Sequence, residues 1–274
     1  MATLSELARL GFLDLEGTIG KLDALVKKVG DSGRSAFAAI SQAASPDQAL
    51  NGLLDLSDID VKAVKKLLSK QPSAERLILT IGASSALIDF LRRHPQSIAL
   101  FEKETALPNR EQLDAFFSPV VADIASTEAA WVGIRICYRE QLLKIAAFDV
   151  TAKDSQAVMP GVAAALADLA GAAVEAGLKV ARWELTALTD HGVFEASEVA
   201  NTRLAVIAMG KCGARELNYI SDVDVIFVAE PSGELESSRA LEIATRLATR
   251  MMRAMDANAP EPALWQVDPN LRPE

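Results

Sequence analysis

The spacing of apolar residues along the chain changes once, at about residue 203. Before that point, apolar side chains recur at the helical period of about 3.6 residues, most clearly over residues 73–95, 126–150 and 159–188. This pattern predicts a region of helices over residues 1–200. The last of the three segments is rich in small residues, which predicts close packing between neighbouring helices.

Single residues predict where some of these helices begin and end. Ser126 lies in the position of an N-cap, and Pro160 suits the first turn of the helix that contains it. His94 and His191 each lie where a helix is expected to end, and the helix dipole favours a histidine there. We therefore interpret both histidines as helix-end residues rather than as catalysts.

After residue 203 the pattern predicts short strands separated by turns. Apolar runs predict three strands, near residues 204–209, 223–229 and 263–268. The first run ends in Gly210, and its continuous apolar character is typical of a buried strand.

Two helical segments are expected between these strands. Residues 213–219 would form one or two helical turns, and residues 236–259 have the spacing of an amphipathic helix with arginines on one face. The expected fold is α+β and mainly α. A helical region over residues 1–200 would precede the first part of an α/β core over residues 201–274.

Composition narrows the class of protein. The chain carries a net charge of −9, which disfavours binding to the phosphates of a nucleic acid. Cys137 and Cys212 lie far apart and are expected to be free thiols. The N-terminus lacks the basic segment of a signal peptide, and no run of about 18 uninterrupted apolar residues occurs. These features predict a cytoplasmic protein with no membrane span and no nucleic-acid partner.

Two carboxylates stand within the second apolar run. Asp222 and Asp224 are two residues apart, so in a strand their side chains project from the same face, about 7 Å apart at Cα. The two negative charges repel each other unless a cation lies between them, and Mg²⁺ prefers oxygen ligands of this kind. Asp268, at the end of the third predicted strand, is a candidate third carboxylate for a Mg²⁺ or Mn²⁺ site, or a general base.

A glycine turn precedes these carboxylates. Gly210 follows the first predicted strand and Gly213 opens the short helical segment, so the backbone there can approach a phosphate closely. Lys211 and Arg215 add positive charge to the same turn. The turn is not a Walker A motif, because no Gly-Lys-Ser/Thr follows a four-residue spacer.

Each feature also has a plainer interpretation. An isolated D-x-D pair is usually an exposed strand end, and a glycine after a strand is usually a turn. Cys212 fits a small buried side chain better than a nucleophile. Three arginines at helical spacing form either a solvated face or a surface for an acidic partner: Arg246, Arg250 and Arg253. The order of strand, glycine turn, short helix and D-x-D strand is what favours chemistry at this site.

Residues 209–228, MGKCGARELNYISDVDVIFV, closely resemble the signature of the bifunctional glutamine synthetase adenylyltransferase/adenylyl-removing enzymes. Residues 83–95, 138–150 and 267–274 resemble further segments of that family, so the resemblance covers roughly residues 75–274. The family carries two nucleotidyltransferase domains of the DNA polymerase β superfamily. Cys212 departs from the family pattern, in which leucine is usual.

The resemblance implies a fold, a reaction and a site. It is to the first of the two domains, which implies phosphorolysis of the AMP–tyrosine bond of adenylylated glutamine synthetase, releasing ADP. The implied metal ligands and catalytic carboxylates are Asp222, Asp224 and Asp268. The implied phosphate- and nucleotide-binding residues are Gly210, Lys211, Gly213, Arg215, Asn218 and Ser221.

Alternatives to this reaction remain open at the level of sequence. The family's second domain transfers AMP from ATP to glutamine synthetase, and a non-catalytic module would dock on glutamine synthetase or a PII-type signalling protein. The family pattern continues beyond Glu274, so we expect an incomplete nucleotidyltransferase core of reduced activity in this chain.

Overall fold

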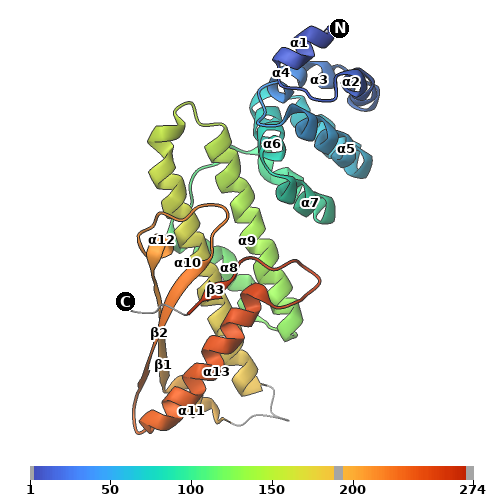
Figure 1. Ribbon diagram of the computed structural model, residues 1–274. Coiled ribbons are helices and arrows are strands. Elements are labelled where there is room, and N and C mark those ends of the chain that lie inside the picture. The colour runs from blue at the N-terminus through green and yellow to red at the C-terminus, as the bar shows by residue number, and fades with distance from the viewer. Residues whose placement is uncertain (1–2, 188–193, 270–274) are drawn as a thin grey trace. The chain divides into compact units, whose positions relative to one another are not determined.

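The computed structural model describes residues 3–187 and 194–269 (Figure 1). The chain forms two compact units. The first comprises Met1–Leu107 and Arg139–Met159, and the second comprises Pro108–Tyr138 and Pro160–Glu274. His191 and residues 270–274, on which part of the sequence interpretation depends, lie outside the described residues.

All regular secondary structure among the described residues of the first unit is helical. Its complete helices are α1 (Leu4–Arg9), α2 (Leu15–Val29), α3 (Asp31–Ser35), α4 (Phe37–Ile40), α5 (Pro46–Leu68), α6 (Gln71–Ala83), α7 (Ser85–Arg93) and the 3-10 helix η1 (Pro95–Glu102). The second part of α9 (Thr127–Val150) and the start of α10 (Ser155–Ala187) complete it. Its core consists of apolar side chains that are inaccessible to solvent, among them Leu25, Leu50, Leu53 and Leu77.

The helical segment expected over residues 73–95 is two helices, because Ser84 interrupts it. Ser84 has extended backbone angles, and its hydroxyl accepts a hydrogen bond from the backbone N–H of Leu87, which caps α7. His94 is the C-cap residue of α7, which confirms the interpretation of this histidine as a helix-end residue.

The second unit combines helices with a small mixed sheet. Its helices are α8 (Arg110–Ala122), the first part of α9, most of α10, α11 (Ala196–Ala200), α12 (Gly210–Gly213) and α13 (Ser237–Asp256). Its strands are β1 (Thr202–Ala208), β2 (Val223–Pro231) and β3 (Val267–Asp268). The strand order is β1-β2-β3, with β1 and β2 antiparallel and β2 and β3 parallel. The fold is therefore α+β and mainly α, as expected.

The expected change at about residue 200 coincides with the first strand. The compact unit that holds the strands is larger than residues 201–274, because α8 and most of α10 belong to it as well. The alanine-rich α10 packs on the sheet as well as on other helices. The apolar pattern of its sequence predicts a helix but does not indicate which element the helix packs against.

The two faces of the sheet have different surroundings. Leu204, Val206 and Phe227 lie on one face and pack against buried side chains of α10 and α13. In Figure 1 both helices lie on the same side of the strands. We call this the inner face. Side chains in the intervening positions, such as Ile207 and Ile226, form the outer face and are 45% and 40% exposed.

This alternation corrects the expectation of a fully buried first strand. Burial in β1 alternates along the whole strand, from buried Thr202 to exposed Ile207. The continuous apolar run arises because apolar residues also occupy the outer face, where Ile207 and Ile226 are paired across the strands.

The third strand is much shorter than expected. Only Val267 and Asp268 pair with β2, although residues 263–268 have strand-like apolar character. The preceding segment bonds elsewhere, because the Leu264 N–H donates to the carbonyl of Met255 and Arg135 donates to the carbonyl of Glu261. These contacts hold the first part of the segment on the end of α13, and contact with β2 begins only at Gln266, whose carbonyl accepts from the Val223 N–H.

Two helix boundaries differ from those predicted. Ser126 caps α9 as expected, since its hydroxyl accepts from the Ala129 N–H at 3.2 Å. In contrast, α10 begins at Ser155, where Asp154 accepts from the Ala157 N–H, so Pro160 lies inside the helix and not in its first turn. The helical turns expected over residues 213–219 are displaced toward the strand, because α12 ends at Gly213.

Helix α10 is long and apolar enough to cross a membrane by length and composition, with a mean hydropathy of 1.7 over its most apolar window. The sequence expectation of no membrane span considered only uninterrupted apolar runs. Half of that window is buried within the structure. A helix in the core of a globular protein passes the same test, and α10 contributes buried side chains such as Leu169 and Ala173 to such a core.

Candidate functional site

Asp224 and Asp268 come together at the junction of β2 and β3. The two residues are Cα partners in the parallel pair, so their side chains project from the same face of the sheet. Neighbouring strands lie about 4.8 Å apart, which places two carboxylates side by side. Val223 and Val225 flank Asp224 and line the inner face, so the Asp224 carboxylate belongs to the outer face.

Asp222 lies just before β2 and is exposed to solvent. It is separated from Asp224 by one strand repeat, about 7 Å at Cα. No three acidic, histidine or cysteine side chains among residues 3–187 and 194–269 are close enough together to hold a metal ion. The structure therefore brings Asp224 and Asp268 together as a pair, and it does not bring Asp222 into a set of three.

A pair of carboxylates still fits Mg²⁺. This ion is usually held by one or two carboxylates, with water and substrate phosphates completing its coordination. Asp224 and Asp268 supply oxygen ligands on one face, and Asp222 lies at the adjacent outward position of the same chain segment. The residues present would hold Mg²⁺ through the pair, with Asp222 as a third, more distant carboxylate.

The glycine turn lies directly against Asp224. Gly210 has a φ of 51°, which disfavours a side chain. A Cβ atom added at Gly210 would lie only 2.7 Å from Asp224 Oδ2. The Met209 N–H also donates to the Asp224 carbonyl at 2.9 Å. The turn and the carboxylate thus form one close-packed unit.

Gly213 has a different structural role. A Cβ atom there would lie 2.4 Å from the carbonyl oxygen of Ala208, so only glycine lets α12 pack against the end of β1. Helix α12 is a single turn of four residues. The contact that requires Gly213 is therefore with the protein's own backbone.

Arg215 is directed away from the carboxylate pair. Its guanidinium donates to both oxygens of Asp168 on α10, at 2.7 and 2.8 Å. Both residues line a cavity of about 330 Å³ between α10 and the inner face of the sheet. The structure thus separates Arg215 from Asp224, with which the sequence grouped it.

The other predicted binding residues are near the turn and accessible. Lys211 and Asn218 are exposed. The Ser221 hydroxyl donates to the carbonyl of Asp222 at 3.0 Å. Cys212 is buried, and burial raises the pKa of its thiol, with a smaller contribution from the charges of Asp168 and Asp224. This burial confirms the interpretation of Cys212 as a small apolar side chain.

Sequence reasoning missed Asp168 and Arg110. Arg110 begins α8 and lines the same cavity, where its guanidinium covers Gly171 of α10. Asp168 is the one charged residue of α10 between Met159 and Val174, and its side chain is only 15% exposed. A charged residue within this alanine-rich part of the helix was the one available signal.

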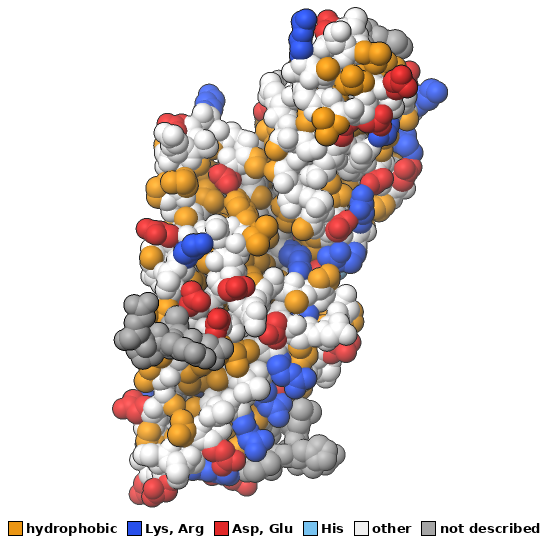
Figure 2. All heavy atoms as spheres, viewed as in Figure 1, with side chains coloured by type: hydrophobic (Ala, Val, Ile, Leu, Met, Phe, Trp, Pro, Cys, Tyr) orange, Lys and Arg blue, Asp and Glu red, His pale blue; other side chains and the backbone are white. Residues whose placement is uncertain are grey.

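The arginine face of α13 is paired and not simply solvated. Arg250 forms an ion pair with the buried Glu184, and Arg253 lies over the ring of Trp131 at 5.5 Å. Arg246 contacts Glu242 at 3.6 Å and the ring of Phe194. Figure 2 shows basic side chains gathered over the region of α13, with acidic ones beside them.

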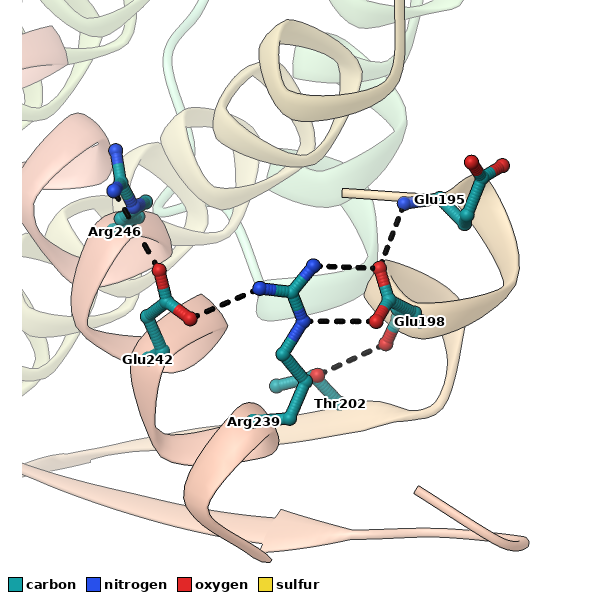
Figure 3. Close-up of polar contacts among 6 residues, drawn as sticks. All are labelled: Glu195, Glu198, Thr202, Arg239, Glu242 and Arg246. Atoms are coloured by element: carbon teal, nitrogen blue, oxygen red, sulfur yellow. Dashed lines mark hydrogen bonds and ion pairs between the residues drawn. The ribbon is translucent and has the colours of Figure 1, made fainter. Parts of the chain in front are cut away.

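Arg239 is the centre of a network that joins α11 to α13 (Figure 3). Its guanidinium donates to both carboxylate oxygens of Glu198 and to Glu242. Glu198 also accepts from the N–H of Glu195, and its carbonyl accepts from the Thr202 hydroxyl. This network fixes the entry to β1, at the opposite end of that strand from Gly210.

Comparison with known proteins places this site in a family. Residues 74–274 match the sequence model of the family described as glutamate-ammonia ligase adenylyltransferase. The chain belongs to this family. The matched range includes the carboxylate pair, the glycine turn and Asp168, so all parts of the candidate site lie within the family region.

Similar adenylyltransferases come from several bacteria. The bifunctional glutamine synthetase adenylyltransferase/adenylyl-removing enzyme of Leifsonia xyli subsp. xyli is 41% identical over 99% of this chain and 28% of its own length. Proteins of the same description from Streptomyces avermitilis and Cutibacterium acnes are 40% and 36% identical over 100% and 98% of this chain. The chain spans 26% and 28% of those two relatives, so it corresponds to about a quarter of each enzyme.

Proposed function

We propose that this chain carries the site at which AMP is removed from adenylylated glutamine synthetase by phosphorolysis. The observation that carries the proposal is the pairing of Asp224 with Asp268 beside the Gly210 turn, in a chain of the adenylyltransferase family. The arrangement of strand, glycine turn and carboxylate strand fits a nucleotidyltransferase core of the DNA polymerase β type.

In this reaction an oxygen of inorganic phosphate attacks the phosphorus of the AMP group. The bond between that phosphorus and the tyrosine oxygen breaks, a new P–O–P bond forms, and ADP leaves. Asp224 and Asp268 would hold Mg²⁺, with Asp222 as a more distant carboxylate, and the ion when bound neutralises charge on the phosphoryl oxygens. The attacking phosphate gives up a proton and the tyrosine oxygen takes one up on leaving, so the reaction balances without net transfer of a proton.

The exposed residues of the turn would bind the phosphates. Lys211 is exposed beside Gly210 and offers a positive charge to the attacking phosphate or to ADP. Asn218 and Ser221 lie on the segment that leads from the turn to Asp222 and offer hydrogen bonds to the nucleotide. The partners of this reaction are glutamine synthetase, inorganic phosphate and ADP, and control of nitrogen assimilation is the physiological setting.

Two other functions use the same residues differently. Transfer of AMP from ATP to glutamine synthetase would need the same carboxylates and the same ion. A docking module for glutamine synthetase or a PII-type signalling protein would need neither. Mn²⁺ or Mg²⁺ binding at Asp224 therefore separates both enzymatic functions from docking, and the direction of AMP transfer separates the two enzymes.

The test uses the complete product of the gene and its Asp224→Asn variant, with adenylylated glutamine synthetase, phosphate and Mg²⁺. We expect release of ADP, reduced by about 10²-fold or more in the variant because a charged ligand is replaced by a neutral one of the same shape. Glu230→Gln, on the same face at the far end of β2, is the matched control and should leave the rate unchanged.

Unchanged ADP release in Asp224→Asn would show that adenylyl removal resides in another part of the protein. If that variant loses transfer of AMP from ATP instead, the site belongs to the adenylyltransferase activity. Loss of neither activity, with binding to glutamine synthetase retained, would favour the docking module.

A further inference from the structure

We propose that the ion pair between Asp168 and Arg215 holds the turn after α12 in place, and that both are positioning residues of the candidate site. The proposal rests on the proposed function in one respect, because the site they would position is the carboxylate site. The structural part of the proposal stands on the conformation of Arg215 alone.

Arg215 occupies a position that normally requires glycine. Its φ is 60°, and it is the one non-glycine residue with a positive φ in the part of the chain that the structure describes. The N–H of Arg215 donates to the carbonyl of Cys212, and the N–H of Glu216 donates to the carbonyl of Lys211. One bond joins residues three apart and the other joins residues five apart, which is the pattern of a Schellman motif. Arg215 occupies its left-handed position, where glycine is preferred.

The ion pair accounts for an arginine at this position. Both oxygens of Asp168 accept from the two terminal nitrogens of Arg215, a paired geometry that fixes the guanidinium in direction as well as distance. The Asp168 side chain is 15% exposed, so water screens this pair less than an ordinary surface pair. A bidentate contact to a rigid helix therefore holds the backbone of Arg215 in a conformation that its side chain disfavours.

The turn held in this way leads directly to the carboxylates. Residues 214–222 connect α12 to β2, and Leu217 is their one buried side chain. Leu217 and the guanidinium of Arg215 both anchor this segment. At one end it is continuous with Gly210, whose backbone contacts Asp224, and at the other it ends in Asp222. A change at Asp168 would therefore reach both sides of the site.

Two substitutions at Arg215 separate a positioning role from a phosphate-binding role. Arg215→Ala removes the ion pair and keeps a residue that disfavours a positive φ. Arg215→Gly removes the same ion pair but adopts a positive φ without strain. If Arg215 positions the turn, glycine should restore much of what alanine loses. If Arg215 binds phosphate, alanine and glycine should be equally damaging.

The first measurement is amide hydrogen exchange in the complete gene product, which does not depend on activity. We expect Asp168→Asn and Arg215→Ala to speed exchange of the amides of residues 213–216 by about 10-fold or more. Arg215→Gly should speed it by less than Arg215→Ala, and peptides from α13 should be unchanged in all three. Glu175→Gln, which alters another acidic residue of α10 in the same cavity, is the matched control and should exchange like the wild type.

The second measurement is ADP release from adenylylated glutamine synthetase. We expect Asp168→Asn to lower kcat by about 10-fold or more and to change the KM for phosphate by less than about 3-fold. Wild-type exchange in Asp168→Asn, equal exchange in Arg215→Ala and Arg215→Gly, or a change in KM without a change in kcat would each overturn the proposal. If the variants exchange faster and the wild-type protein releases no ADP, the result supports the positioning role of the ion pair and contradicts only the proposed function.

Discussion

Asp224 and Asp268 are paired partners in a parallel ladder of only two residue pairs, the other being Val223 with Val267. So short a ladder contributes few hydrogen bonds of its own. The position of Asp268 therefore depends on the segment that joins α13 to β3, and the position of Asp224 depends on β1 and the Gly210 turn. The carboxylate pair therefore depends on neighbouring segments for its geometry, and substitutions in those segments should change metal binding.

The first prediction concerns the metal. The gene product should bind Mn²⁺ with a Kd of about 1 mM or lower, and Asp224→Asn should weaken binding by about 10-fold or more because it removes one of two adjacent carboxylates. Asp222→Asn should weaken it less, because Asp222 lies outside the ladder. Calorimetric titration measures all three affinities. Equal affinity in the wild type and in Asp224→Asn would contradict the assignment of this pair as the metal site.

The second prediction compares two glycines of similar backbone conformation. Gly210 and Gly233 have φ values of 51° and 63°, so alanine at either position costs about 1–2 kcal/mol of conformational strain. Only at Gly210 does an added Cβ collide with Asp224, at 2.7 Å from Oδ2, whereas the nearest side-chain atom at Gly233 is 3.7 Å away. Gly210→Ala should therefore weaken Mn²⁺ binding and slow ADP release in addition to lowering stability.

Gly233→Ala supplies the control for this comparison. It should lower the free energy of unfolding by a similar amount and leave both Mn²⁺ affinity and the rate of ADP release unchanged. The quantities to compare are the denaturation midpoints and the Mn²⁺ titrations of the two variants. Loss of Mn²⁺ binding in both would indicate that general destabilisation, and not displacement of Asp224, is responsible.

Local patterns in the sequence were sufficient for the positions of β1 and β2 and for the glycine turn that follows β1. These features depend on residues close together in the chain, and apolar runs bounded by a glycine encode them. Asp268 was a candidate third carboxylate because it ends a predicted strand, but its register with Asp224 was not predicted. No local pattern near Asp268 determines which strand it joins or at which residue.

The parts that could not be predicted all depend on long-range contacts. Residues 263–265 have strand-like character, but Arg135, far earlier in the chain, bonds to the carbonyl of Glu261, and the Leu264 N–H bonds to Met255 of α13. Arg215 looks like a phosphate ligand until Asp168 is placed beside it. In both cases a charged side chain is satisfied by a partner that only the folded chain reveals.

The third prediction concerns Arg135, whose side chain is inaccessible to solvent. Its guanidinium donates to the carbonyls of Ala254, Ala257 and Glu261, which joins the end of α13 to the segment before β3. Arg135→Met would remove three donors from carbonyls that are buried or partly buried. We expect the free energy of unfolding to fall by about 3 kcal/mol or more. Chemical denaturation measures this change.

The control for Arg135 is an exposed arginine. Arg203 is 69% exposed and contacts Glu230 at 3.6 Å, so Arg203→Met should change the stability by about 0.5 kcal/mol or less. Because Arg135 supports the segment that carries Asp268, Arg135→Lys should also weaken Mn²⁺ binding under conditions in which the protein remains folded. If Arg135→Lys is folded and binds Mn²⁺ with wild-type affinity, Arg135 does not contribute to the position of Asp268.

The fourth prediction concerns the pH dependence of stability at the network of Figure 3. The hydrogen bonds from Arg239 lower the pKa of Glu198 below its ordinary value of 4.5, and the bond from the Glu195 N–H lowers it further. The folded state therefore binds the Glu198 proton more weakly than the unfolded state. The stabilisation is complete above about pH 4.5 and is lost as the pH falls through the lowered pKa.

Glu198→Gln should flatten the fall in stability below about pH 4.5, because glutamine has no proton to gain. Arg239→Met should flatten it as well, since it removes the largest cause of the lowered pKa. The double variant should show no further flattening if the two residues act as one pair. Thermal melting midpoints measured between about pH 3 and about pH 6 give these slopes. A slope in Glu198→Gln equal to that of the wild type would mean that other carboxylates dominate acid unfolding of this unit.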